Sequence, residues 1–451
     1  MAAVRLASPV QDFDLLALHA FAPQRYPVLL ESLGNQGSGE HYDLLLALPQ
    51  AALTSHGGRL QAQGWVPPQA AGFFTALTAW QQQLALPSMP ADTPFCGGWF
   101  IYLGYEAARL AEPAVHWHAT PGGLPDAYAL RCAAAVVRRH ASREMFICAE
   151  SQDGAQQVAA DVRRCAPLPV PRPRVFAVEE DKPEIFLAGV RRVLDYVQAG
   201  DAYQVNLSRG WRAPLHGPGD YLDLYRALRH HNPAPFAGLA RLGNGATVLS
   251  SSPERLLRVQ DGIVTTEPIA GTRPRHADPQ HDAALIRALK ANAKERAEHL
   301  MLIDLERNDL GRVCETGSIE VPELMAVHSH THVHHIVSQV QGRLRAGVGV
   351  GDVLQAVFPG GTITGCPKVR VMQIIAELEQ EGRGAYTGSM GYLSHSGRLD
   401  MNILIRTLVC AAGQVSLRAG AGIVADSDPD QELAETRAKA RGLLLALEGA
   451  A

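Results

Sequence analysis

The chain has 451 residues, of which 47% are hydrophobic and 19% charged, and its formal net charge at pH 7 is −4. These values are typical of a folded globular protein and disfavour binding to nucleic acid or to an anionic membrane. No apolar stretch is long enough to span a membrane, and the first residues lack the apolar core of a secretion signal. Seven cysteines form no CxxC pair, so we expect a protein of the reducing cytoplasm.

A proline-rich connector divides the chain. In the segment Ala166–Arg174 proline recurs at every second position, which favours an extended, stiff conformation. The connector, residues 166–180, separates an N-terminal region, residues 1–165, from a C-terminal region, residues 181–451. The C-terminal region carries most of the motifs that follow.

Helical and strand patterns are interleaved along the C-terminal region. Apolar residues at helical spacing predict helices over 183–201, 219–233, 281–313 (one helix or two) and 428–449. Alternating apolar residues predict strands over 203–213 and 246–272, and a series of hairpins over 384–426. This mixture predicts an α+β fold with large antiparallel β-sheets, packed as a sandwich with outer helices.

Five histidines lie in the segment His328–His335. Histidine is a common zinc ligand, but four of the five alternate along a segment that continues into an apolar, β-branched sequence. On a single strand these four would share one face, while His335 would lie on the other with Val337. The spacing therefore favours a half-exposed strand edge over a zinc site.

Two glycine-rich segments have the composition of nucleotide-binding loops without their context. Gly420–Ala425 fits GxGxxA, but too little chain follows for the next strand and acidic residue of a dinucleotide fold. Gly360–Lys368 lacks the adjacent Gly-Lys-Ser/Thr of a P-loop. Either segment still offers backbone N–H groups to an anion such as a carboxylate.

Several glutamates have spacings that suit chemistry. Glu295 with Glu298, and Glu432 with Glu435, are three residues apart on predicted helices, so each pair shares one face. If the two faces meet, the carboxylates suit Mg²⁺ or Ca²⁺; if they do not, the pairs are ordinary surface residues. Glu254 lies between predicted strands and is either solvated or, if shielded from water, a general acid.

A series of further motifs follows in order along the chain. They are Gly200–Ser208, Ser251–Arg255, Pro268–Arg275, Ala297–Asp304, Arg307–Gly311, Val333–Ser338, Pro359–Lys368, Tyr386–Gly388, Asn402–Thr407, Gly420–Val424 and Glu432–Lys439. Together they make residues 180–445 resemble the chorismate-utilising enzymes: anthranilate synthase component I, aminodeoxychorismate synthase component I, and the isochorismate and salicylate synthases. Cys96–Glu106 is similar to the N-terminal half of that family.

The resemblance implies chorismate as substrate and Mg²⁺ as cofactor. It implies that Glu298 and Glu435 bind Mg²⁺, with Glu295 and Glu432 close behind. The metal ion would hold the ring carboxylate of chorismate and draw charge as the 4-hydroxyl leaves.

The resemblance also assigns the remaining pocket residues. Glu254 would protonate the leaving 4-hydroxyl, and His335 would lie near the ring. Arginine suits a bidentate grip on a carboxylate, and glycines let backbone N–H groups approach the substrate. The residues implied in binding or lining the pocket are Gly271, Thr272, Thr362, Tyr386, Arg406, Gly420, Gly422 and Lys439.

Two positions discriminate among family members. Isochorismate and salicylate synthases carry a lysine that activates water where this chain has Gln204, so the resemblance disfavours those activities. Many aminodeoxychorismate synthases have PIKGT, whose lysine attacks C2 of chorismate. This chain has Ala270 in PIAGT, which is typical of anthranilate synthase, and we expect free ammonia to replace the lysine as the nucleophile at C2.

The N-terminal region bears on the product. Its short length and the Tyr-Asp-Leu within His41–Leu46 favour aminodeoxychorismate synthase component I, which acts in p-aminobenzoate and folate biosynthesis. Leu29–Ser32 is similar to the tryptophan-contacting segment of anthranilate synthase, which is the alternative function and predicts tryptophan as a ligand. The chain lacks the GxCxG motif of a glutamine amidotransferase, so we expect a separate amidotransferase subunit to supply ammonia.

Overall fold

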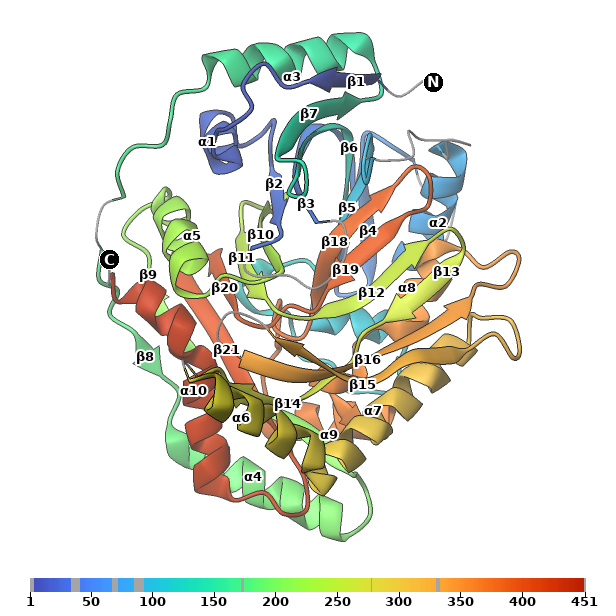
Figure 1. Cartoon of the computed structure of the whole chain (residues 1–451), viewed down its shortest axis with the longest axis vertical. Coiled ribbons are helices and arrows are strands. Elements are labelled where there is room, and N and C mark those ends of the chain that lie inside the picture. Colours follow the sequence, from blue (N-terminus) through green and yellow to red (C-terminus); the bar gives the residue numbers. More distant parts are fainter. Residues whose placement is uncertain are drawn as a thin grey trace.

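The computed structural model describes residues 4–33, 41–66, 72–84, 93–171, 174–276, 278–329 and 333–449 (Figure 1). Its helices are α1 (Leu15–Phe21), α2 (Phe73–Leu84), α3 (Gln152–Arg164), α4 (Pro183–Gln198), α5 (Asp220–His231), α6 (Pro279–Ala291), α7 (Ala293–Gly311), α8 (Val350–Val357), α9 (Lys368–Glu379) and α10 (Pro429–Leu447). Three 3₁₀ turns are η1 (Tyr105–Leu110), η2 (Pro121–Gly123) and η3 (Gly361–Ile363).

The strands of the N-terminal region are β1 (Val4–Ala7), β2 (Val28–Glu31), β3 (Tyr42–His56), β4 (Arg59–Gln63), β5 (Gly98–Leu103), β6 (Ala127–Arg139) and β7 (Glu144–Ala149). Those that follow are β8 (Glu179–Glu180), β9 (Gln204–Pro214), β10 (Phe236–Arg241), β11 (Thr247–Ser252), β12 (Arg255–Gln260), β13 (Ile263–Thr266), β14 (Ile269–Pro274), β15 (Glu320–Ser329), β16 (Val333–Arg343), β17 (Gly365–Cys366), β18 (Ser389–Ser394), β19 (Leu399–Asn402), β20 (Thr407–Ala411) and β21 (Gln414–Ile423).

The described strand pairs are antiparallel and link into one large sheet, with helices packed on its outside (Figure 1). The predicted α+β fold with large antiparallel sheets is confirmed. Strands from the two regions pair directly: β5 pairs with β18 from Gly98–Ser394 to Leu103–Ser389, and β2 pairs with β10. The two regions therefore share backbone hydrogen bonds.

The predicted helices and hairpins of the C-terminal region are present, with ends shifted by a few residues. The stretch 281–313 contains two helices. Asn292 has an extended backbone between α6 and α7, and its side-chain oxygen accepts the backbone N–H of Glu295 at 3.2 Å. Such a cap satisfies an N–H group that the first turn of a helix leaves unpaired. None of the helices in the described part of the chain is long and apolar enough to cross a membrane.

The histidine segment differs from its prediction. It is a hairpin rather than a single strand: β15 ends at Ser329, β16 begins at Val333, and His328 lies opposite His335. His334 is 1% exposed, with its ring nitrogens 2.7 Å from Ser329 Oγ and 2.9 Å from Asp282 Oδ1. The predicted exposed face of four histidines is therefore wrong for His334. His330 and His332 lie outside the described residues.

Candidate active site

One half of the site is built where β9 pairs with β21. Gln204 and Asn206 alternate along β9, and Gly422 lies opposite Asn206 in the register. A Cβ atom added to Gly420 would lie 2.5 Å from Asn206 Oδ1 and 2.6 Å from the Tyr386 hydroxyl, and one added to Gly422 would lie 3.0 Å from Gln204 Nε2. Polar side chains thus lie directly over Gly420 and Gly422. A residue with a side chain at either position would come too close to them.

Helix α10 adds charge to the same half. The Lys439 ammonium donates to the carbonyl of Gly420 at 3.1 Å and pairs with Glu435 Oε1 at 2.6 Å. Arg406 is half-buried nearby with a left-handed backbone, φ 52°. Burial lowers the pKa of its guanidinium, and the neighbouring Tyr386, Glu435 and Glu254 oppose that shift. The half therefore presents two cations and a tyrosine hydroxyl to an anionic ligand.

Glu254 lies between β11 and β12 and is shielded, not solvated. It is 7% exposed, and the Thr362 hydroxyl donates to its Oε1 at 2.7 Å. Burial raises the pKa of Glu254 to about 7, although Thr362, Lys439 and Arg406 oppose the shift. A carboxyl group that keeps its proton near neutral pH meets the requirement for a general acid.

The second half of the site lies on β14, β16 and α7. A bulge between Ala270 and Thr272 gives Gly271 a φ of 65° and puts its carbonyl 3.4 Å from His335 Nδ1. A Cβ atom on Gly271 would lie 2.7 Å from Glu295 Oε2. Ala270, Gly271, His335 and Glu295 are therefore neighbours. The side chain of Thr272 lies outside the described part of the structure.

The donor chemistry of the four glutamates fits Mg²⁺, which prefers carboxylate oxygens. Glu295 Oε2 is buried without a hydrogen-bond partner in the described structure, so this oxygen would be available to a cation. Its other oxygen binds Arg273 at 2.8 Å. Within the described ranges, no three His, Cys, Asp or Glu side chains gather closely enough to hold a metal ion.

The turn that carries Tyr386 is held by residues that the sequence analysis missed. The Glu106 carboxylate accepts the backbone N–H groups of Arg383 at 2.6 Å and Gly384 at 3.0 Å. Arg383 is buried and pairs with Glu379 at 2.6 Å. Glu106 belongs to the N-terminal region, so only the folded structure reveals this contact. Asn206 was also missed, although its alternation with Gln204 on a predicted strand could have identified it.

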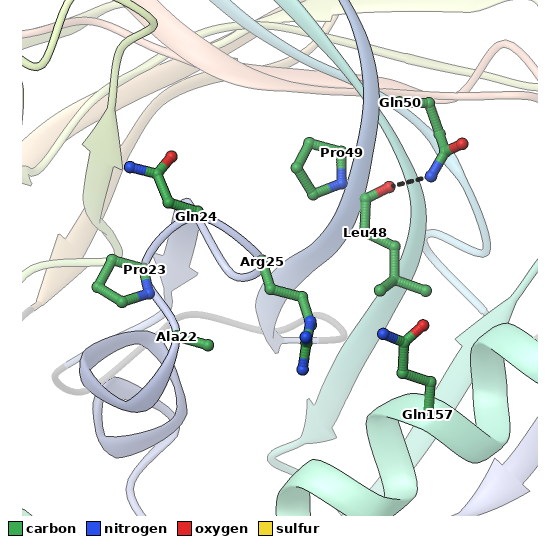
Figure 2. Close-up of a pocket in the computed structure, with 8 residues that line it drawn as sticks. All are labelled: Ala22, Pro23, Gln24, Arg25, Leu48, Pro49, Gln50 and Gln157. Atoms are coloured by element: carbon green, nitrogen blue, oxygen red, sulfur yellow. Dashed lines mark hydrogen bonds between the residues drawn. The ribbon is translucent and has the colours of Figure 1, made fainter.

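Two features elsewhere do not join this site. Lys368, in the glycine-rich segment, binds Asp309 Oδ2 at 2.5 Å and is therefore not free for a phosphate. A shallow hollow between the end of α1, the middle of β3 and α3 is lined by Pro23, Arg25, Gln50 and Gln157 (Figure 2). Its only charged lining side chain, Arg25, is paired with Asp161, and the hollow includes none of the predicted site residues.

Comparison with known proteins identifies the class to which this fold and site belong. Residues 30–445 match the family described as chorismate binding enzyme, and the chain is a member of that family. The chain is 44% identical to anthranilate synthase component 1 of Streptomyces coelicolor, covering 83% of this chain and 78% of the relative. It is 38% identical to aminodeoxychorismate synthase component 1 of Klebsiella aerogenes, covering 96% of each.

A solved structure supports the same assignment. The crystal structure of anthranilate synthase component I from Streptococcus pneumoniae superposes with a TM-score of 0.81 at 30% identity, covering 98% of this chain and all of that one. MenF, the menaquinone-specific isochorismate synthase from Escherichia coli, has the same fold at 21% identity, with a TM-score of 0.73. The chain is therefore a chorismate-utilising enzyme.

Proposed function

We propose that the chain is component I of an aminodeoxychorismate synthase. It would aminate chorismate at C4 to 4-amino-4-deoxychorismate, using ammonia from a glutamine amidotransferase subunit. The observation that carries the chemical step is Glu254, a buried carboxyl with a pKa near 7 that is hydrogen-bonded to Thr362. It is suited to protonate the 4-hydroxyl of chorismate as it leaves.

The chain's own residues would bind and orient a dianionic substrate. Arg406 and Lys439 supply positive charge, and the Tyr386 hydroxyl, which lies over Gly420, would donate a hydrogen bond to a carboxylate beside them. When bound, Mg²⁺ supplies Lewis-acid stabilisation of the ring carboxylate, and we assign Glu298 and Glu435 to hold it, with Glu295 and Glu432 behind. Burial of Glu254 keeps water from competing for its proton.

Ala270 requires a nucleophile other than the enzyme, because its side chain has none. In the proposed first step ammonia forms a bond to C2, the ring double bonds shift, and the C4–O bond breaks as Glu254 delivers the proton that makes water. The added ammonia loses a proton to become an amine. In the second step another ammonia bonds to C4, the double bonds shift back, and the protonated C2 amine leaves as ammonia. One ammonia is consumed overall.

Two observations support the C4 product. The alignment with the Klebsiella aminodeoxychorismate synthase component 1 runs along 96% of both chains. In addition, Asp43 of the Tyr-Asp-Leu motif is built into the buried N-terminal core, where its carboxylate accepts the backbone N–H of Ser32 at 3.0 Å. Ser32 ends the predicted tryptophan-contacting segment, and tryptophan binding there stays a prediction.

Anthranilate synthase component I is the second candidate. Ala270 favours it directly, and relatives with that name include the Streptomyces and Streptococcus proteins. Because the Streptococcus chain has nearly the same extent as this one, length does not separate the two functions. Both candidates share the first step. In this one the 2-amino intermediate loses the proton on C2 as the C3–O bond breaks, and the leaving enolpyruvyl group takes up a proton to become pyruvate, which leaves anthranilate.

Product identification tests both candidates. Purified chain, chorismate, Mg²⁺ and ammonium salt are incubated with and without an added aminodeoxychorismate lyase, and products are identified by mass spectrometry. We expect p-aminobenzoate only when the lyase is present. Anthranilate with pyruvate, with or without the lyase, would replace the first candidate by the second. Chorismate bound but unchanged would reject both.

A further inference from the structure

A second buried carboxyl group lies near Glu254 and has no role in the site described so far. Glu306 is on α7, the helix that also carries Glu295 and Glu298, and is 5% exposed. Its Oε2 has no hydrogen-bond partner in the described structure. A buried polar atom without a partner destabilises the folded protein. A functional role for Glu306 would explain why such an atom is present here.

The turn η3 connects Glu306 to Glu254. A Cβ atom added to Gly361 would lie 3.8 Å from Glu306 Oε1 and would clash with Leu305 of the same helix, so the turn is packed directly against α7. The next residue of the turn, Thr362, donates its hydroxyl to Glu254. Gly361, which packs against α7, and Thr362, which binds Glu254, are therefore adjacent residues of the same turn.

The charges around Glu306 favour its neutral form. Burial, together with the carboxylates of Asp309 and Glu254, raises the pKa of Glu306 to about 8. Lys368 and the Thr266 hydroxyl oppose the shift, but Lys368 is already paired with Asp309. The surroundings of Glu306 therefore favour its protonated form, and the charge of Glu254 contributes to that preference.

We propose that Glu306 is a positioning residue for Glu254: it supports the turn η3 and remains a neutral acid while Glu254 gives up its proton. The reason is electrostatic. When Glu254 protonates a leaving group it becomes a carboxylate in a buried site, and a second carboxylate nearby would hold the proton back. This inference rests on the proposed function only in that Glu254 acts as the acid.

Infrared spectroscopy of the substrate-free protein tests the charge state. The C=O band of protonated carboxylic acids is followed during a pH titration of the wild type, Glu306→Gln and Glu254→Gln. When the infrared spectrum of Glu306→Gln is subtracted from that of the wild type, we expect the difference spectrum to contain the acid band of Glu306. This band should disappear near pH 8, in line with the raised pKa of Glu306. In Glu254→Gln the Glu306 band should disappear at lower pH, because the neighbouring charge is gone. Two results would overturn the proposal. One is a Glu306 that is already ionised at neutral pH, and the other is a Glu306 titration that is the same in the wild type and in Glu254→Gln.

Kinetics test the positioning role. We expect Glu306→Ala to lower kcat for chorismate about tenfold or more with little change in KM, and Glu306→Gln to recover most of that loss. Asp304→Asn is the matched control, because it removes an exposed charge from the same helix. Equal kcat for Glu306→Ala and wild type would reject the role. Because the spectra need no substrate, they stand even if the product assay rejects the proposed function.

Discussion

The two halves of the candidate site are built differently. In the β9–β21 half, polar side chains lie over glycines within the sheet, and Lys439 is bound to the backbone of β21. In the β14–β16–α7 half, a bulge at Gly271 and the ion pair of Glu295 with Arg273 set the positions of the side chains. The comparison teaches that glycines within the sheet fix the close packing of the first half, whereas the second half depends on contacts between side chains of a strand and a helix.

The largest expected effect comes from Glu254, which lies against the first half. We expect Glu254→Gln to lower kcat about 10²–10⁴-fold, because an amide cannot donate the required proton. Wild-type kcat should fall as pH rises through about 7, where Glu254 loses its proton. Steady-state kinetics across pH, with the exposed Glu184→Gln as control, measure both effects. If kcat of Glu254→Gln still falls at high pH as it does in the wild type, another residue is the acid.

The same variant should affect stability with a defined sign. The folded-state pKa of Glu254 is raised above that of an unfolded glutamate, so the folded protein binds more protons between about pH 4.5 and 7. Stability contributed by this group is complete below that window and is lost as pH rises through it. Thermal unfolding should therefore show the melting temperature of Glu254→Gln rising relative to that of the wild type from pH 5 to pH 8. A constant difference across pH would contradict the burial argument.

Gly420→Ala tests whether the first half is preformed. The added Cβ would lie 2.5 Å from Asn206 Oδ1 and 2.6 Å from the Tyr386 hydroxyl, so both must move. We expect KM for chorismate to rise about tenfold or more with the fold retained. Gly217→Ala is the control, since a Cβ there meets nothing within 4 Å. Equal KM values for the two variants would show that the glycine surface is not used.

Glu106→Ala tests how the N-terminal region supports that half. It would leave the buried N–H groups of Arg383 and Gly384 without their acceptor. Each orphaned group costs about 1–3 kcal/mol, so we expect a loss of about 2–5 kcal/mol in the free energy of unfolding. Urea denaturation measures it, with the half-buried Glu112→Ala for comparison. A smaller loss in Glu106→Ala than in Glu112→Ala would contradict the contact.

The smallest expected effect concerns the ion pair between Arg273 and Glu295 in the second half of the site. Arg273 competes with a metal ion for Glu295, so Arg273→Gln should lower the Mg²⁺ concentration that gives half-maximal activity about threefold. Titration of activity with Mg²⁺ measures this, with Arg398→Gln as a control far from Glu295. A higher Mg²⁺ requirement in Arg273→Gln would mean that the arginine supports the metal site instead.

Much of the first half could be predicted from sequence because its information is local. Alternation on β9 and glycine in β21 are visible as patterns of period two, and Glu254 follows a strand that the pattern predicts. The charge state of Glu254 could not be predicted, since it depends on burial and on groups distant in the sequence, such as Thr362, Arg406 and Lys439.

The second half was less predictable because its geometry depends on chain reversals. The histidine segment has the composition of one strand, yet it turns back between Ser329 and Val333, so that His328 faces His335. Glu295 and Glu298 do share a helix, but helical spacing says nothing about where α10 lies. The role of Glu106 depends on its contact with Arg383, which lies 277 positions further along the chain.

The pairing of β5 with β18 and of β2 with β10 has a consequence for how the protein is made. During synthesis the N-terminal strands leave the ribosome first and must wait for partners made much later. If the segment 181–451 were produced alone, β18 and β10 would each expose a strand edge, which is a template for aggregation. Co-expression of the two segments as separate chains should therefore yield a soluble pair from parts that are insoluble singly.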